Sequence, residues 1–187
     1  MRIPQIEPWF GEEEANAVAD YMRSGGWVTE FDKTREFEAA IAAFTGAKHC
    51  IVTNNGTVSL TLAALATGVK AGDEVIVPDF SFPATANAVI QQGAVPVFVD
   101  IDLATFNLDP SLLERAITPR TKAIMPVHAF GLTADMTSIS EIASRHGIPV
   151  IEDAACALGA THRGREAGTL GLAGVFSFHP RKIITTA

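Results

Sequence analysis

Short apolar runs alternate with helical patterns along most of the chain. The runs are rich in Val, Ile and Phe and are apolar at consecutive positions, whereas the stretches between them place apolar residues three to four positions apart. Strands that are apolar on both faces and are joined by helices are typical of a mostly parallel sheet with helices on both sides. The pattern therefore predicts an α/β fold.

Two amphipathic helical patterns come first, at about 11–24 and 33–44, with the loop SGGWVTEFD between them. The predicted strands that follow are HCIVT (49–53), EVIVP (74–78), VPVFVD (95–100), KAIMPV (122–127), IPVIED (148–153) and GVFSF (174–178). The helices predicted between them cover about 57–67, 84–92, a segment opened by Asp109 and Pro110 as cap and first-turn residue, and 135–146. Ligands of such sheets bind beyond the carboxyl ends of the strands, so the residues after each strand are the first candidates for chemistry.

The amino-acid composition of the chain limits the kinds of function that it can have. With 187 residues, of which 48% are hydrophobic and 19% charged, the chain is expected to fold as a globular domain. A formal charge of -7 without a run of Lys or Arg argues against nucleic acid as a partner. No apolar stretch approaches the ~20 residues that span a bilayer, and no secretion signal is recognisable, so we expect a soluble, cytoplasmic protein that does not bind membranes. Two cysteines outside any CxxC pair predict neither a disulfide framework nor a metal site.

A candidate phosphate cradle follows the first predicted strand, in the sequence NNGTVSL. Gly56 allows a ligand to approach the backbone closely, and Thr57 begins a helix whose free N–H groups favour an anion such as phosphate. Many turns contain Asn-Gly for conformational reasons alone, so this motif also has a purely structural interpretation. Neither a GxGxxG nor a GxxxxGK[ST] motif occurs, so the sequence has neither the Rossmann dinucleotide-binding fingerprint nor a P-loop.

Five further candidate residues lie at or just beyond the ends of later strands. Phe82, in DFSFPATAN, could pack in the core or lie over a planar ligand. Glu152 and Asp153 end an apolar strand, where a carboxylate needs a cation or several hydrogen-bond donors as partners. Ser177 is predicted in the last strand and Lys182 just beyond it, where a desolvated amine could form a Schiff base, although an isolated Lys is usually a surface residue.

Together these residue types match what pyridoxal 5'-phosphate requires. A cradle holds the phosphate, an aromatic ring packs on the pyridine, a carboxylate keeps the ring nitrogen protonated, and a lysine binds the aldehyde. Each residue alone has a simpler explanation, and their joint occurrence favours the cofactor site.

The sequence resembles the DegT/DnrJ/EryC1/StrS family of sugar aminotransferases, and most of all its perosamine-synthase-like members. The motifs that carry the resemblance are NNGTVSL, PDFSFPATAN, VPVFVDID, TKAIMPVHAFG, VIEDAACALGA and GVFSFHPRKIITT, which together span nearly the whole chain. The resemblance implies the aspartate-aminotransferase fold, fold type I, and a homodimer with active sites at the subunit interface.

Carried over residue by residue, the resemblance implies that Lys182 binds the cofactor aldehyde and Asp153 pairs with the pyridine nitrogen. It further implies that Phe82 stacks on the cofactor and that Gly56, Thr57 and Ser177 contact its phosphate. Cys156 stands where the family commonly has Gln or His, which puts the contact with the cofactor's 3-hydroxyl in doubt. Lys182 separates the chain from the family's dehydratases, which have His at this position.

Family members are about twice as long as this chain. We therefore expect residues 1–187 to form an incomplete large pyridoxal-phosphate-binding domain with an N-terminal helical segment, without the small C-terminal domain, and we expect this form alone to lack sugar aminotransferase activity. The full-length form is expected to be a homodimer.

The reaction that the resemblance implies is a ping-pong transamination. Glutamate would donate the amine, and the acceptor would be a nucleotide-linked keto sugar, a 4-keto-6-deoxyhexose, in amino-sugar biosynthesis. The alternatives are another pyridoxal-phosphate reaction on the same fold, a non-catalytic cofactor-binding module, or an inactive fragment of such an enzyme.

Overall fold

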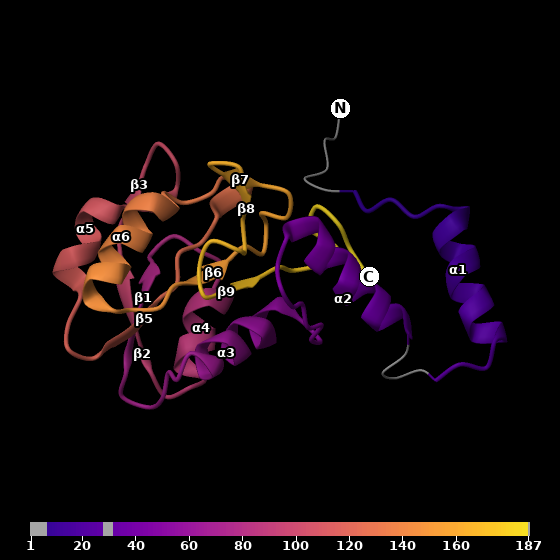
Figure 1. Cartoon of the computed structure of the whole chain (residues 1–187), viewed down its shortest axis with the longest axis horizontal. Helices are drawn as coiled ribbons and strands as arrows, with labels where there is room; N and C mark the ends of the chain where they lie inside the picture. Colours follow the sequence, from indigo (N-terminus) through magenta and orange to yellow (C-terminus); the bar gives the residue numbers. More distant parts are fainter. Residues whose placement is uncertain (1–6, 28–31, 187) are drawn as a thin grey trace.

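The structure, a computed structural model, describes residues 7–27 and 32–186. Helices and strands alternate in it as the apolar pattern predicts (Figure 1). The helices are α1 (Glu12–Arg23), α2 (Asp32–Thr45), α3 (Gly56–Ala66), α4 (Ala84–Ile90), α5 (Pro110–Ala116) and α6 (Met136–His146), with a 3₁₀ turn η1 (Ala129–Gly131). The strands are β1 (Glu74–Pro78), β2 (Val95–Val99), β3 (Ile101–Asp102), β4 (Asn107–Leu108), β5 (Thr121–Ile124), β6 (Ile151–Asp153), β7 (Thr161–His162), β8 (Arg165–Glu166) and β9 (Ala173–Val175).

The central strands run parallel. β1 pairs with β2 on one side and with β5 on the other, and β6 pairs with β9. Single bridges from Ile124 to Val150 and from Val127 to Asp153 continue the arrangement from β5 to β6. The spatial order is therefore β2-β1-β5-β6-β9, which confirms the predicted α/β fold with a mostly parallel sheet.

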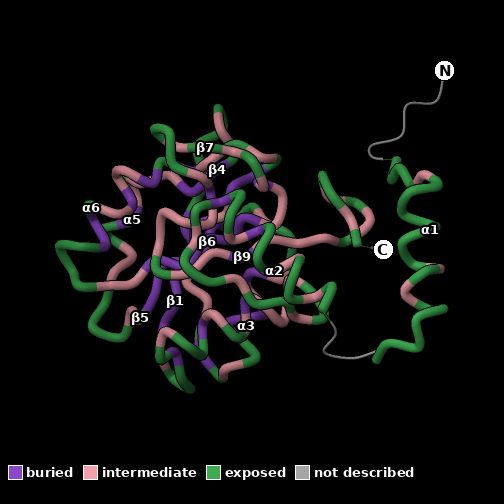
Figure 2. Tube along the Cα trace, turned by 45° about the vertical axis from the view of Figure 1, so that its right-hand side comes forward, coloured by how far each residue is buried: buried purple, intermediate pink, exposed green. Residues whose placement is uncertain are grey.

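Each face of the sheet is covered by its own pair of helices, because successive side chains of a strand point to opposite faces. Val75 and Val77 of β1 pack with α3 and α4, whereas Ile76 packs with α5 and α6. All three are fully buried, and the buried positions in Figure 2 concentrate along these strands. This arrangement explains why the strand sequences are apolar at consecutive positions.

Local capping fixes where the helices begin. The Asn55 side chain accepts a hydrogen bond from the Val58 amide at 2.9 Å, so α3 starts at Gly56. Asp109 caps α5 in the same way, with Pro110 in the first turn, as the sequence predicts.

Two strand predictions need correction. HCIVT is not a strand, and GVFSF is a strand only at its start, because β9 ends at Val175. A strand needs a neighbour for its backbone groups, and in the described part of the chain β9 pairs with β6 alone. The open edge of β9 and the segment 46–55 instead line a cleft of about 760 Å³. Exposed apolar side chains such as Ile51 and Leu172 border this cleft.

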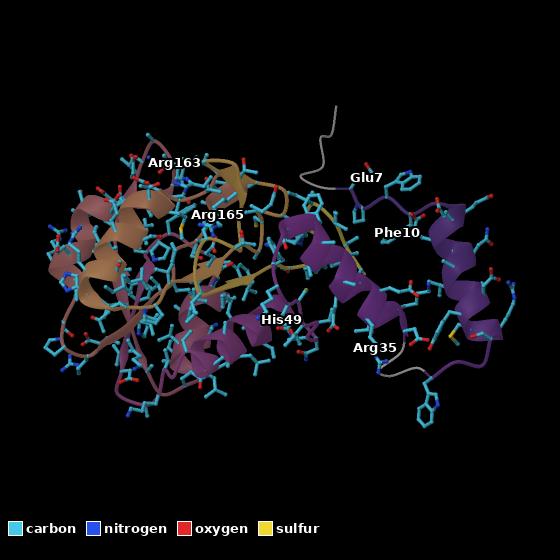
Figure 3. All side chains as sticks on the ribbon, viewed as in Figure 1. Glu7, Phe10, Arg35, His49, Arg163 and Arg165 are labelled. Carbon is cyan, nitrogen blue, oxygen red and sulfur yellow. The ribbon has the colours of Figure 1, made fainter. Side chains whose placement is uncertain are left out.

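The two N-terminal helices form where predicted, but their apolar faces are largely exposed. In α2 Ile41 is buried, while Phe44 is 59% exposed, and no residue of α1 is buried. Figure 3 shows Phe10 beside α1, apart from the sheet and its covering helices. Residues 28–31 of the predicted loop lie outside the described residues.

Two short hairpins, β3–β4 and β7–β8, were not predicted, because two-residue strands carry too little pattern to be recognised. The second hairpin is followed by a loop that packs closely against the sheet. A Cβ atom on Gly171 would come within 2.6 Å of the Val150 carbonyl oxygen, and one on Gly174 within 2.2 Å of the Gly168 carbonyl oxygen. Only glycine fits at these two positions without moving the backbone.

Candidate cofactor site

Asp153 lies at the carboxyl end of β6 and is buried. Thr85, in the first turn of α4, donates a hydrogen bond from Oγ1 to Asp153 Oδ2 at 2.7 Å, and the Ala155 amide donates to Oδ1 at 3.2 Å. Ser81 Oγ lies 2.6 Å from Thr85 Oγ1, which extends the hydrogen-bonded chain toward the β1 end. The carboxylate is thus held in one orientation by residues from two strand ends.

Burial dominates the electrostatics of Asp153. Desolvation raises the pKa of its carboxyl above the ordinary value, and the hydrogen bonds from Thr85 and Ala155, together with the charge of Lys182, oppose this rise. A buried carboxylate with a raised pKa gains from a cation placed next to it, such as a protonated pyridine nitrogen.

The raised pKa of Asp153 predicts a pH dependence of stability. The folded chain retains a proton that the unfolded chain releases, so the contribution of Asp153 to stability is full below the unfolded pKa and falls as pH rises through the folded pKa. We expect Asp153→Asn to be more stable than the parent chain at neutral pH in the absence of cofactor, and the difference to shrink toward pH ~4, near the unfolded pKa.

Urea unfolding of both proteins across this pH range measures the difference. Asp20→Asn, at a side chain that is 74% exposed on α1, is the matched control and is expected to unfold like the parent at every pH. A difference for Asp153→Asn that is constant with pH would contradict the assignment.

The amino end of α3 forms the candidate phosphate cradle. Among the described residues, the amides of Gly56 and Thr57 donate to no protein acceptor, since the Asn55 side chain caps Val58. Ser177 lies directly beside Gly56, and a Cβ atom on Gly56 would come within 3.2 Å of Ser177 Cβ. Ser177, although distant in sequence, therefore lies at the helix terminus that Gly56 and Thr57 form, where free amides and hydroxyls favour a phosphate.

Ser177 and Lys182 occupy positions that differ from the prediction. Ser177 lies beyond the end of β9 instead of inside it, and Lys182 lies in an irregular segment further along the chain. Lys182 is nevertheless half-buried, and its Nζ lies 3.0 Å from Cys156 Sγ. Cys156 follows the end of β6 by three residues, so the Lys182 amine lies at the same edge of the sheet as Asp153.

Phe82 precedes α4 and is 77% exposed, so the core interpretation of this residue is wrong. Its ring is available to a ligand at the strand ends. Whether it stacks on a cofactor stays a prediction.

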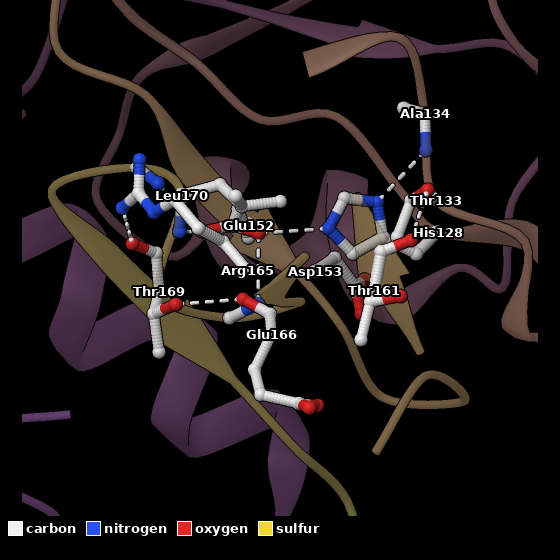
Figure 4. Close-up of polar contacts among 12 residues, drawn as sticks. His128, Thr133, Ala134, Glu152, Asp153, Thr161, Arg165, Glu166, Thr169 and Leu170 are labelled. Carbon is white, nitrogen blue, oxygen red and sulfur yellow. Dashed lines mark hydrogen bonds and ion pairs between the residues drawn. The ribbon is translucent and has the colours of Figure 1, made fainter. Parts of the chain in front are cut away.

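Glu152 points to the other side of β6 from Asp153 and is fully buried. It accepts hydrogen bonds from the amides of Gly168, Leu170 and Gly171 at 2.6–2.8 Å and from His128 Nε2 at 2.8 Å (Figure 4). Since His128 Nδ1 accepts from the Ala134 amide at 3.1 Å, the ring proton is on Nε2. Glu152 thus holds the loop between β8 and β9 against the sheet, and His128 has a structural role as one of its hydrogen-bond donors.

His128→Ala should therefore lower the free energy of unfolding by about 3 kcal/mol, because it leaves a buried carboxylate without one of its donors. The midpoint of urea unfolding measures the loss. His146→Ala is the control, since His146 forms the same type of pair with Glu114 on the surface, where such pairs contribute less than about 1 kcal/mol. Equal effects of the two substitutions would contradict the role of the buried pair.

The residues present fit pyridoxal 5'-phosphate. The close packing of Gly56 against Ser177 makes a cradle that a larger side chain would fill, and the free amides of α3 suit a phosphate. Asp153 is a buried carboxylate suited to a cationic ring nitrogen, and Lys182 supplies an amine at the same edge.

Known proteins resemble this chain in sequence over almost its whole length. Its sequence matches the DegT/DnrJ/EryC1/StrS aminotransferase family over residues 8–187. The chain belongs to this family. It is 57% identical to GDP-perosamine synthase of Caulobacter vibrioides over 186 residues, which are 99% of this chain and 50% of the relative. It is 50% identical to UDP-2-acetamido-2-deoxy-3-oxo-D-glucuronate aminotransferase of Pseudomonas aeruginosa over 86% of this chain and 45% of the relative.

Solved structures agree with the family assignment. Spr1654 of Streptococcus pneumoniae, determined in a PLP form, superposes with a TM-score of 0.94 at 34% identity, over 99% of this chain and 51% of that one. The DegT/DnrJ/EryC1/StrS chain described here therefore has the fold of pyridoxal-phosphate-dependent aminotransferases. It spans about half the length of the curated relatives it matches.

Sequence reasoning missed three residues that support the site. Thr85 donates a hydrogen bond to Asp153, Ser81 in turn contacts the Thr85 hydroxyl, and the Gly168 amide, in the loop between β8 and β9, donates to Glu152. The sequence PATAN places Thr85 in the first turn of a helix near a strand end, which is a usable signal. Its hydrogen-bond partner Asp153, 68 positions further along the chain, could not be found without the fold.

No helix among residues 7–27 and 32–186 is long and apolar enough to cross a membrane.

Proposed function

We propose that this chain carries the cofactor-binding part of a pyridoxal-phosphate-dependent aminotransferase that acts on a nucleotide-linked keto sugar. The observation that carries the proposal is the pairing of β6 with β9, which places Asp153 and the Gly56–Ser177 cradle at one edge of the sheet, with Lys182 next to Cys156 just beyond β6. The names of the relatives, with GDP-linked and UDP-linked sugars, support the substrate class. A 4-keto-6-deoxyhexose is the sugar we favour, and glutamate the amino donor.

The residues of the chain have distinct roles in this proposal. Lys182 Nζ would hold the cofactor by its aldehyde, and as a free amine it would accept and return the proton at the reacting substrate carbon. Asp153 holds the ring nitrogen in its protonated state, while Gly56, Thr57 and Ser177 bind the phosphate and Phe82 covers the ring. The cofactor, when bound, supplies an electron sink for the carbanion.

The full-length form is proposed to be a homodimer. Exposed aromatic side chains support an interface near the strand ends, since patches of this kind often mark contacts between subunits. Phe80 and Phe106 come from two loops and Phe130 from the turn η1, with ring centroids 5.4–5.9 Å apart, and each residue is at least 41% exposed.

Two preparations test the proposed function. Cofactor attachment is measured on the 187-residue chain by borohydride reduction and mass spectrometry. Turnover is measured on a hybrid in which this chain replaces the matching half of the Caulobacter vibrioides GDP-perosamine synthase. We expect a reduced adduct on the chain, and in the hybrid a spectral change on adding glutamate followed by amination of the keto sugar.

The outcome also separates the alternatives. An adduct without any response to glutamate in the hybrid would indicate a non-catalytic cofactor-binding module. The absence of a reduced adduct on both proteins would refute the proposed cofactor site.

A further inference from the structure

Cys156 and Lys182 form a side-chain pair that the proposed transamination does not require. Lys182 Nζ lies 3.0 Å from Cys156 Sγ, and both residues are half-buried, so small reagents can reach them. A thiol in hydrogen-bond contact with a primary amine brings a readily oxidised atom next to a nucleophile.

The backbone holds both residues in place. Cys156 lies in a turn closed by the hydrogen bond from the Ala157 amide to the Ala154 carbonyl at 2.9 Å, and Gly131 packs against the Cys156 carbonyl. The Lys182 amide donates to the His179 carbonyl at 2.8 Å. The contact therefore joins two fixed points of the backbone through one flexible lysine stem, which allows Nζ to move closer to Sγ.

The other cysteine has different surroundings. Burial, and after it the charge of Glu38, raise the pKa of the Cys50 thiol, which disfavours its reactive thiolate form. Cys50 has no hydrogen bond to a lysine among the described residues. The chain thus contains an internal reference for any reaction of Cys156.

We propose that Cys156 is an oxidative modification site that closes onto Lys182 through a covalent bond between Sγ and Nζ. Hydrogen peroxide first oxidises the thiol to a sulfenic acid and is itself reduced to water. The neutral Nζ amine then attacks Sγ with its lone pair, the S–O bond breaks, and the hydroxide leaves as water with one of the two Nζ protons. The product is a sulfenamide that contains two hydrogen atoms fewer than the original pair.

The bond blocks the amine on which the active site depends. This consequence, unlike the bond itself, rests on the proposed function, because only a lysine that must bind an aldehyde loses its role when Nζ is occupied. A dithiol attacks Sγ, releases the amine and restores Lys182, so the modification is reversible.

Peptide mass spectrometry of the peroxide-treated chain tests the proposal. We expect a joined peptide that contains Cys156 and Lys182, lacks two hydrogen atoms and separates on dithiothreitol treatment. Cys156→Ser and Lys182→Arg should each abolish it. Peroxide treatment in urea should reduce its yield at least tenfold, because the two residues are 26 positions apart and meet only in the folded chain.

Several results would overturn the proposal. One is oxidation of Cys156 to a sulfinic or sulfonic acid in the folded chain without any joined peptide. Another is a joined peptide that forms equally well in urea, or one that contains Cys50 instead of Cys156.

A separate arm distinguishes this inference from the proposed function. The chain is first incubated with pyridoxal 5'-phosphate and borohydride, and then with peroxide. Loss of the joined peptide supports both ideas, since Lys182 is then already occupied. A joined peptide that persists at full yield, together with no cofactor adduct, supports the sulfenamide and refutes the cofactor site.

Discussion

Lys182→Ala should abolish covalent attachment of pyridoxal 5'-phosphate and lower turnover of the hybrid enzyme by at least about a thousandfold. The amine both binds the aldehyde and transfers the proton, and general acid–base catalysis alone contributes roughly 10²–10⁴-fold. Borohydride reduction followed by mass spectrometry measures the attachment, and the rate of the glutamate half-reaction measures the proton transfer.

Lys33→Ala is the matched control for this experiment. Lys33 lies on α2, where its side chain is 60% exposed and pairs with Glu36, so its removal should change neither attachment nor turnover. A reduced adduct of unchanged yield in Lys182→Ala would show that another lysine binds the cofactor.

Asp153→Asn should leave the attachment at Lys182 intact but slow the glutamate half-reaction by about 10²–10³-fold, the scale seen when one electrostatic stabiliser is removed from an active site. A neutral amide still accepts the Thr85 hydrogen bond, yet it cannot hold the ring nitrogen in its protonated state. Stopped-flow absorbance of the hybrid measures the rate.

Thr85→Val separates the charge of Asp153 from its orientation. This substitution removes the 2.7 Å hydrogen bond and keeps the carboxylate, so we expect a smaller loss than for Asp153→Asn. A near-normal rate in Asp153→Asn would contradict the role of the carboxylate, whatever Thr85→Val does.

Asp153→Asn also links function to stability. The same substitution that slows the reaction is expected to stabilise the cofactor-free chain at neutral pH, because burial raises the pKa of this carboxyl. A catalytic group that costs stability in the absence of its ligand is a common compromise in active sites.

The sequence was sufficient to predict those parts of the fold in which the local pattern of residues matches their environment in the structure. The run at β1 is apolar at consecutive positions because helices cover both faces of the sheet there, and the structure confirms strands at β1, β2 and β5. The start of α5 at Asp109 and Pro110 was also predictable, since the capping signal lies within the sequence itself.

The structure of other segments depends on contacts with distant parts of the chain, which a local sequence pattern does not reveal. HCIVT has the composition of a strand, but no strand of the described chain lies beside it, and its backbone therefore stays irregular. The features of the candidate site also fall into those that a local pattern indicates and those that depend on distant neighbours. The residue types at 56, 153 and 182 could be recognised from their places after apolar runs, whereas the contacts of Asp153 with Thr85 and of Lys182 with Cys156 are formed across distant parts of the chain.

The tight packing at Gly171 and Gly174 affects how a mutational scan of this protein would be interpreted. Any side chain at Gly174 must displace backbone atoms of the neighbouring loop, so substitutions there would be as damaging as those at Lys182. Intolerance to substitution alone would then point to positions that contact neither cofactor nor substrate. Selection for folded protein and selection for activity, scored side by side, would separate the two kinds of position: Gly174 variants would fail both, and Lys182 variants only the second.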